Sequence, residues 1–129
     1  MISKQAKPPA PESADLLRDL RLVATALDDR KAQDIVILDL RGLSDATDYF
    51  IMASGTSDTH VRALAEHVIE RLKAADRNTH HAEGLRAGRW VLLDYLDFVV
   101  HVFHPTLRDF YQLEKLWIDA PVVPVNFDR

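Results

Sequence analysis

One segment, residues 89–117, constrains the fold more than any other part of the sequence: RWVLLDYLDFVVHVFHPTLRDFYQLEKLW. Two apolar stretches, Trp90–Asp94 and Phe98–Phe103, flank a short acidic turn, which is the pattern of two antiparallel strands. Pro105 then suits the first turn of a helix, because the N–H group that proline lacks has no helical acceptor at that position. The segment therefore predicts a pair of antiparallel strands followed by a helix that ends near Trp117.

The two predicted strands carry more apolar surface than one layer of helices can cover. Side chains alternate between the two faces of a strand, so Trp90, Leu92 and Asp94 share a face, as do Val99, His101 and Phe103. Helices that pack on one face of the sheet leave the other open unless a partner covers it. Aromatic residues mixed with a histidine and a carboxylate are typical of an interface, and Trp90 is of the residue type that anchors one.

The predicted last helix has a polar residue inside its apolar side. At 100° per residue its apolar residues span one wide arc, and Glu114 falls in the middle of that arc. The residues of the arc are Leu107, Phe110, Tyr111, Trp117 and Ile118. A carboxylate among aromatic rings needs a cation or water, because a dry unpaired charge is costly. Two interpretations stay open: Glu114 pairs within the protein at the helix edge, or it belongs to an interface.

The rest of the chain predicts helices and strands in the order α-β-β-α-β-β-β-α. Apolar spacing indicates a helix over 13–30 and a second helix that Ser57 caps. The aliphatic run 34–40 predicts a strand buried on both faces and therefore central in a sheet. Strands are also expected over 49–53 and, more weakly, over 78–83. The order predicts an α/β fold, a single domain with a mixed five-stranded sheet and helices packed against it.

The chain of 129 residues has the length of one domain with a single core. Residues 1–12 hold three prolines and almost no large apolar side chain, so we expect a disordered arm. The folded domain is predicted over 13–120. The tail, 121–129, contains two more prolines and is expected to run extended.

Composition indicates where the protein is located and which kinds of partner it can bind. No apolar run is long enough for a membrane span, and no secretory signal is expected. The absence of cysteine suits a reducing cytosol, so a cytoplasmic location is predicted. The formal charge is −4, the pI is about 5.8, and the sequence shows no basic stripe. Direct nucleic-acid binding is therefore not expected, although an acidic protein can dock on a basic one beside nucleic acid.

The turn at Ser54-Gly55-Thr56-Ser57 raises an enzymatic alternative. A small-residue turn between a strand and a helix can bind an anion, and nucleotidyltransferases use a Gly-Ser turn of this kind. Such enzymes also need a nearby acidic pair for magnesium ions, and no closely spaced pair follows on a strand. The six histidines show no zinc-binding spacing. We therefore predict no catalytic residue, metal or cofactor, and keep a magnesium-dependent nucleotide-binding enzyme as the alternative.

A series of short motifs, in order and spacing, resembles the ribosomal silencing factor family, also called RsfS or Iojap-like proteins. The resemblance extends over residues 16–120. The motifs are Asp34-Ile35, Thr47-Asp48-Tyr49-Phe50, Ser54-Gly55-Thr56-Ser57, Glu83-Gly84, Trp90-Val91-Leu92-Leu93-Asp94, His101-Val102-Phe103, Arg108, Phe110-Tyr111, Leu113-Glu114 and Leu116-Trp117. One departure is Leu96, which stands in the turn where the family often has glycine.

The resemblance implies a non-enzymatic factor whose fold is distantly related to nucleotidyltransferases. Such a factor binds ribosomal protein fourteen of the large subunit, blocks joining of the small subunit and represses translation when nutrients are scarce. No direct nucleic-acid contact other than one with ribosomal RNA is expected. The implied partner-binding residues are Trp90, Asp94, His101, Arg108 and Tyr111, and Glu114 is added as a further candidate. A third possibility is a homodimer formed through the same open face.

Overall fold

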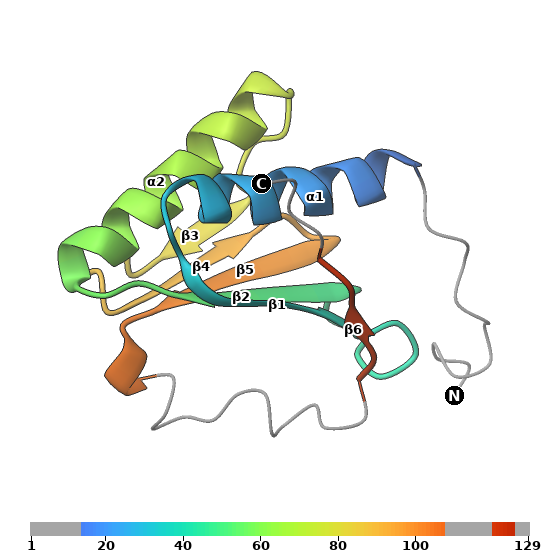
Figure 1. Cartoon of the computed structure of the whole chain (residues 1–129). Coiled ribbons are helices and arrows are strands. Elements are labelled where there is room, and N and C mark those ends of the chain that lie inside the picture. The colour runs from blue at the N-terminus through green and yellow to red at the C-terminus, as the bar shows by residue number, and fades with distance from the viewer. Residues whose placement is uncertain (1–13, 108–119, 126–129) are drawn as a thin grey trace.

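The computed structural model of the chain describes residues 14–107 and 120–125. Its elements are α1 (Ala14–Asp29), β1 (Gln33–Asp39), β2 (Tyr49–Ser54), α2 (Asp58–Ala74), β3 (His81–Glu83), β4 (Trp90–Asp94), β5 (Phe98–Phe103) and β6 (Val122–Val123). The strands form one sheet in the order β3-β4-β5-β2-β1-β6. Helices α1 and α2 lie together on one face of it (Figure 1). The predicted α/β class with helices packed on a mixed sheet is confirmed.

The predicted number of strands is wrong by one, because the sheet has six strands and not five. The sixth, Val122–Val123, comes from the tail and pairs antiparallel with β1, with Val122 opposite Leu38. Asp39 extends this contact by donating its backbone N–H to the carbonyl of Pro121 at 2.9 Å. A strand of two residues between prolines has no detectable period, and only its distant partner strand defines it.

The prediction that the aliphatic run 34–40 lies at the centre of the sheet is also wrong. The central strands are β5 and β2, which pair in parallel, whereas β1 has only the short β6 beyond it. Ile37 and Leu38 point to opposite faces of β1 and are 3% and 4% exposed. The apolar run correctly predicted a strand that is buried on both faces. Burial on both faces does not, however, determine the position of a strand in the sheet.

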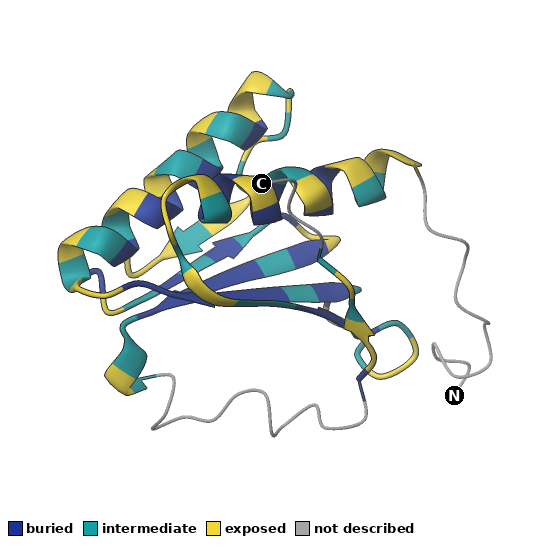
Figure 2. Cartoon of the chain, viewed as in Figure 1, coloured by how far each residue is buried: buried dark blue, intermediate teal, exposed yellow. Residues whose placement is uncertain are grey.

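The helices bury one apolar side each against the sheet, and Figure 2 shows these buried residues facing the strands. In α2 the buried residues are Val61, Leu64, Ala65, Val68 and Leu72, at helical spacing. Ser57 is confirmed as the N-cap of α2, since its Oγ accepts the backbone N–H of His60 at 3.0 Å. Over the two described ranges, no helix is long and apolar enough to cross a membrane.

The turn between β4 and β5 gives Leu96 a left-handed backbone, with φ at 73°. Leucine adopts this conformation at a cost, which the surrounding hydrogen bonds offset. The backbone N–H of Leu96 donates to Asp94 Oδ1 at 2.8 Å, and its carbonyl accepts the Thr47 hydroxyl at 3.0 Å. The turn thus keeps a geometry that glycine would favour, with leucine in the left-handed position.

Candidate functional site

The sheet face opposite the helices carries a second apolar cluster. Its buried members are Leu38, Leu40, Met52, Phe103 and Ala120, and its half-buried members are Val36, Phe50, Trp90 and Leu107. The residues of β4 and β5 that face the helices, among them Val91, Val100 and Val102, belong to a separate core cluster. The alternation predicted for these strands is therefore confirmed. We call Phe50, Trp90, His101 and Phe103 the aromatic sheet face.

Strand register brings these rings together. Trp90 of β4 lies opposite Phe103 of β5, and their ring centroids are 5.2 Å apart. His101 stacks on Phe103 at 5.8 Å with an interplanar angle of 10°. Phe50 of β2 meets the edge of His101 at 4.7 Å and 73°. Offset and edge-on contacts of this kind add to the energy of burial, so the face is an ordered cluster of rings.

A hydrogen bond joins Trp90 to His101 and fixes the state of the histidine. The indole Nε1–H of Trp90 donates to Nδ1 of His101 at 3.1 Å. Because Nδ1 accepts, the ring is neutral and carries its proton on Nε2. Burial lowers the pKa of His101 to about 4, so the ring stays neutral at physiological pH. A second proton on the ring would occupy Nδ1 and remove the acceptor that holds the indole.

The opposite ring nitrogen has no such bond. Nε2 of His101 is buried and has no hydrogen-bond partner among the residues that the structure describes. An unpaired buried N–H costs free energy, which the rest of the fold must offset. His101 is only 5% exposed, and its effect within the structure is to hold the orientation of Trp90 through their hydrogen bond.

The structure brings some of the predicted partner-binding residues together. Trp90 and His101 are in contact, whereas Asp94 lies on the same face of β4 but at the other end of the strand. Asp94 accepts the backbone N–H of Leu96 and so stabilises the turn that follows it. The remaining candidates lie outside the described residues; they are Arg108, Tyr111 and Glu114. A role in partner binding stays a prediction for all six.

Sequence reasoning did not include Phe50 among the site residues. Its position follows from the parallel pairing of β2 with β5, which sets Phe50 beside Val99 and Met52 beside His101. Parallel partners come from distant parts of a chain, so local alternation could place Phe50 and Met52 on one face without saying which face. The pairing was therefore the missing information.

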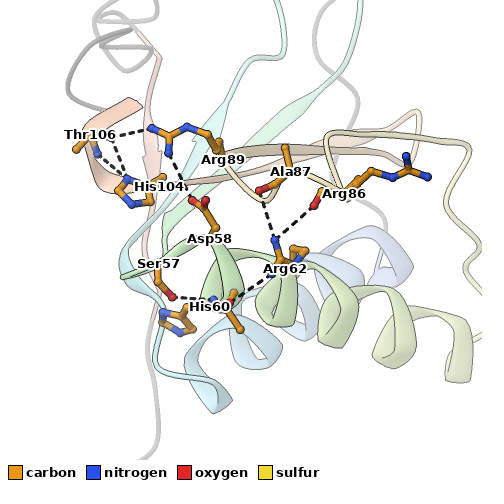
Figure 3. Close-up of polar contacts among 10 residues, drawn as sticks. Ser57, Asp58, His60, Arg62, Arg86, Ala87, Arg89, His104 and Thr106 are labelled. Atoms are coloured by element: carbon orange, nitrogen blue, oxygen red, sulfur yellow. Dashed lines mark hydrogen bonds and ion pairs between the residues drawn. The ribbon is translucent and has the colours of Figure 1, made fainter.

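The turn proposed as an anion site uses its backbone donors within the protein. The N–H of Gly55 donates to the carbonyl of Phe103 at 2.9 Å, and the N–H of Thr56 donates to Nδ1 of His60 at 2.8 Å. His60 also contacts the Ser57 cap (Figure 3). A Cβ at Gly55 would lie 2.9 Å from Cγ2 of Val61, so the glycine permits close packing of the turn on α2.

Metal binding was the other requirement of the enzymatic alternative. Within residues 14–107 and 120–125, no group of three or more His, Cys, Asp or Glu side chains could hold a metal ion. The turn and the acidic residues therefore provide no positive support for magnesium-dependent nucleotide chemistry.

Fold and site together define an α/β protein whose sheet is covered by helices on one face and carries clustered aromatic rings on the other. The family model described as "Ribosomal silencing factor during starvation" matches residues 12–129. The chain belongs to this ribosomal silencing factor family.

Individual relatives agree with the family assignment. The ribosomal silencing factor of Bacillus subtilis is 43% identical over 108 residues, which cover 84% of this chain and 92% of the relative. A mouse protein named "Mitochondrial assembly of ribosomal large subunit protein 1" is 31% identical over 102 residues, covering 77% of this chain and 45% of the relative. A crystal structure from Chromobacterium violaceum superimposes with a TM-score of 0.77 at 36% identity, covering 88% of this chain and 89% of that one.

Proposed function

We propose that this protein is a non-enzymatic, cytoplasmic factor that binds the large ribosomal subunit through ribosomal protein fourteen. Once bound, it occupies space that the small subunit needs and so blocks subunit joining and represses translation. Membership of the silencing factor family supports this proposal, as does the mouse relative, which is named for the large ribosomal subunit. None of the names of the reported relatives describes an enzyme.

The observation that carries the proposal is the aromatic sheet face. Trp90 is half-buried there, with its indole held by His101 and packed against Phe103. Large rigid aromatic side chains at the centre of a patch supply most of the binding energy in many interfaces, because they bury much surface and lose little entropy. A stable contact of roughly 1,200–2,000 Å² would be enough for steric blocking.

The charge of the chain supports a basic partner. The formal charge of −4 favours association with a basic ribosomal protein and mainly increases the rate of encounter. In this proposal Trp90 is the anchor, His101 holds its orientation and Asp94 supports the turn at the far end of the face. Arg108, Tyr111 and Glu114 complete the proposed contact set.

Two assays on the full chain test the proposal. Co-sedimentation with purified large subunits measures binding, with purified small subunits as the control for non-specific pelleting. Light scattering on mixing the two subunits then measures joining, and we expect pre-incubation of the large subunit with the protein to reduce the signal. Absence of binding to large subunits would overturn the proposed function. Unchanged binding of the double variant Trp90→Ala/Tyr111→Ala would overturn the proposed surface alone.

A homodimer through the same face is a further part of the partner prediction. If the face served both contacts, self-association and ribosome binding would compete. Dilution below the dimer dissociation constant would then strengthen ribosome binding, whereas an unchanged affinity would argue against a shared face.

A further inference from the structure

Three arginines that are scattered in the sequence lie together in the fold. Arg62 comes from the second turn of α2, and Arg86 and Arg89 come from the loop between β3 and β4. Figure 3 shows Arg89 and Arg86 toward the two ends of this loop, with Arg62 reaching it from the helix between them. We call these three residues the arginine row. Because they belong to two separate segments, the sequence shows no basic stripe.

The loop that carries the row is fixed to the start of α2. Nη1 of Arg62 donates to the carbonyls of Arg86 and Ala87, at 3.4 Å in each case. Gly88 has φ at 71°, and a Cβ there would lie 2.5 Å from the carbonyl oxygen of Asp58. The backbone thus approaches the helix at a point where only glycine fits. Arg62 therefore holds the loop, and the loop presents the other two arginines.

The acidic groups near the row leave it with an excess of positive charge. Asp58 is the carboxylate that faces it, with Oδ1 at 3.6 Å from Nη1 of Arg89, and both side chains are more than two-fifths exposed. An ion pair of that length is weak, although Oδ1 of Asp58 is itself buried and has no hydrogen bond among the described residues. Glu83 is paired with His81 at 2.7 Å, and Glu66 lies one turn further along α2 than Arg62.

Arg86 and Arg89 differ in the number of polar contacts that their guanidinium groups make. Arg86 is exposed, and its side chain makes no hydrogen bond or ion pair with the residues that the structure describes. Arg89 is also exposed and reaches the Thr106 hydroxyl only at 3.5 Å. Both guanidinium groups are therefore available to exchange water or a long contact for a stronger acceptor.

We propose that the arginine row binds the phosphate backbone of ribosomal RNA beside the protein contact of the aromatic sheet face. This proposal rests on the proposed function. Arg89 directly precedes Trp90, so the row adjoins the aromatic sheet face in the chain. A line of guanidinium groups matches a run of phosphates better than it matches one small anion, since each group can take a separate phosphate. The overall charge of −4 makes this a local contact, formed once the protein is docked.

The test compares charge variants in binding to purified large ribosomal subunits over a series of KCl concentrations at fixed magnesium. The double variant Arg86→Gln/Arg89→Gln removes two charges and leaves Arg62 to hold the loop. The slope of log affinity against log salt is negative, and we expect its magnitude to decrease by about one for each arginine removed. The affinity at ~0.1 M KCl should fall about 10-fold. Arg18→Gln/Lys73→Gln removes the same charge from exposed positions on α1 and α2 away from the loop and should leave the slope unchanged.

A photo-crosslink identifies the class of partner. A benzophenone amino acid in place of Ala87, which is exposed, should crosslink to ribosomal RNA in the large subunit. Crosslinks to ribosomal protein alone, or the same salt slope in the wild type and in the arginine variant, would overturn the RNA contact while the proposed function stands.

If the wild type did not bind large subunits, the proposed function would fail separately. Titration with a fluorescein-labelled single-stranded RNA of mixed sequence at low salt would then test whether the arginine row binds RNA. Binding that the arginine variant loses and the control variant keeps would support the RNA contact. Absence of binding, or equal binding by all three proteins, would overturn it.

Discussion

The two faces of the sheet are both closely packed, but they differ in chemistry. The face under α1 and α2 is lined by a continuous apolar cluster, and Phe98 and Val100 are fully buried in it. The aromatic sheet face instead includes a buried histidine with one nitrogen bonded to a tryptophan and the other without a partner among the described residues. A buried polar atom without a partner among the described residues also occurs on the helix side, at Oδ1 of Asp19. The aromatic sheet face differs because its buried histidine holds a half-buried tryptophan by a hydrogen bond. We infer that the first face maintains the fold, and in the proposed function the second face makes the contact with the partner.

Truncation in the helix-covered face should produce the largest loss of stability. Phe98→Ala removes a fully buried ring that stacks on Tyr95 at 5.0 Å, so the free energy of unfolding should fall by about 3–5 kcal/mol. Trp90→Ala should cost less, because Trp90 is only half-buried. Urea denaturation of both variants measures the difference. A larger loss for Trp90→Ala would remove the distinction between the two faces.

The buried histidine should make the aromatic sheet face sensitive to acid. The pKa of His101 is about 4 in the folded protein and ~6.5 in the unfolded chain, so the unfolded chain binds more protons between these values. The contribution to stability is therefore complete above pH ~6.5 and is lost as pH falls toward 4, amounting to about 2 kcal/mol between pH 7 and pH 5.

The variant His101→Gln isolates this effect from the carboxylates, which titrate in both proteins. Urea denaturation at pH 7 and at pH 5 gives the loss for each protein, and the loss should be smaller by about 2 kcal/mol in the variant. An equal loss of stability in both proteins would mean that protonation of His101 does not disturb the packing of the aromatic sheet face.

The smallest expected effect concerns the turn that joins the two strands carrying Trp90 and His101. Leu96 is 58% exposed, with φ at 73°, and glycine adopts this backbone without a steric cost. Leu96→Gly should raise the free energy of unfolding by about 0.5–1 kcal/mol, since the relief of strain exceeds the extra entropy of the unfolded chain. Thermal unfolding monitored by circular dichroism measures it. A lower melting temperature would show that the leucine side chain stabilises the turn.

Local pattern was sufficient for most of the fold. Alternation over 90–103 placed each side chain of the two strands on its face, and Ser57 marked the start of α2 through its capping chemistry. These features depend on residues close in sequence, so local sequence patterns are enough to predict them.

The features that were missed depend on distant residues. The two-residue strand Val122–Val123 exists only through β1, and β1 itself looks central because both of its faces are covered. Phe50 joins the site through the parallel pairing of β2 and β5. The arginine row needs the packing of a loop on α2 at Gly88. In each case a contact between distant segments, and no local propensity, supplies the decisive information.

In the proposed function, Trp90 on the aromatic sheet face anchors the protein to the large ribosomal subunit. The direct test is the dissociation constant for purified large subunits of Trp90→Ala and of its matched control, Leu43→Ala, which shortens an exposed leucine at the other end of the sheet. We expect Trp90→Ala to weaken binding by about 30-fold or more, as for a central aromatic anchor, and Leu43→Ala to bind like the wild type. Equal affinity of the two variants, both shown by circular dichroism to be folded, would contradict the proposed role of Trp90 as the anchor.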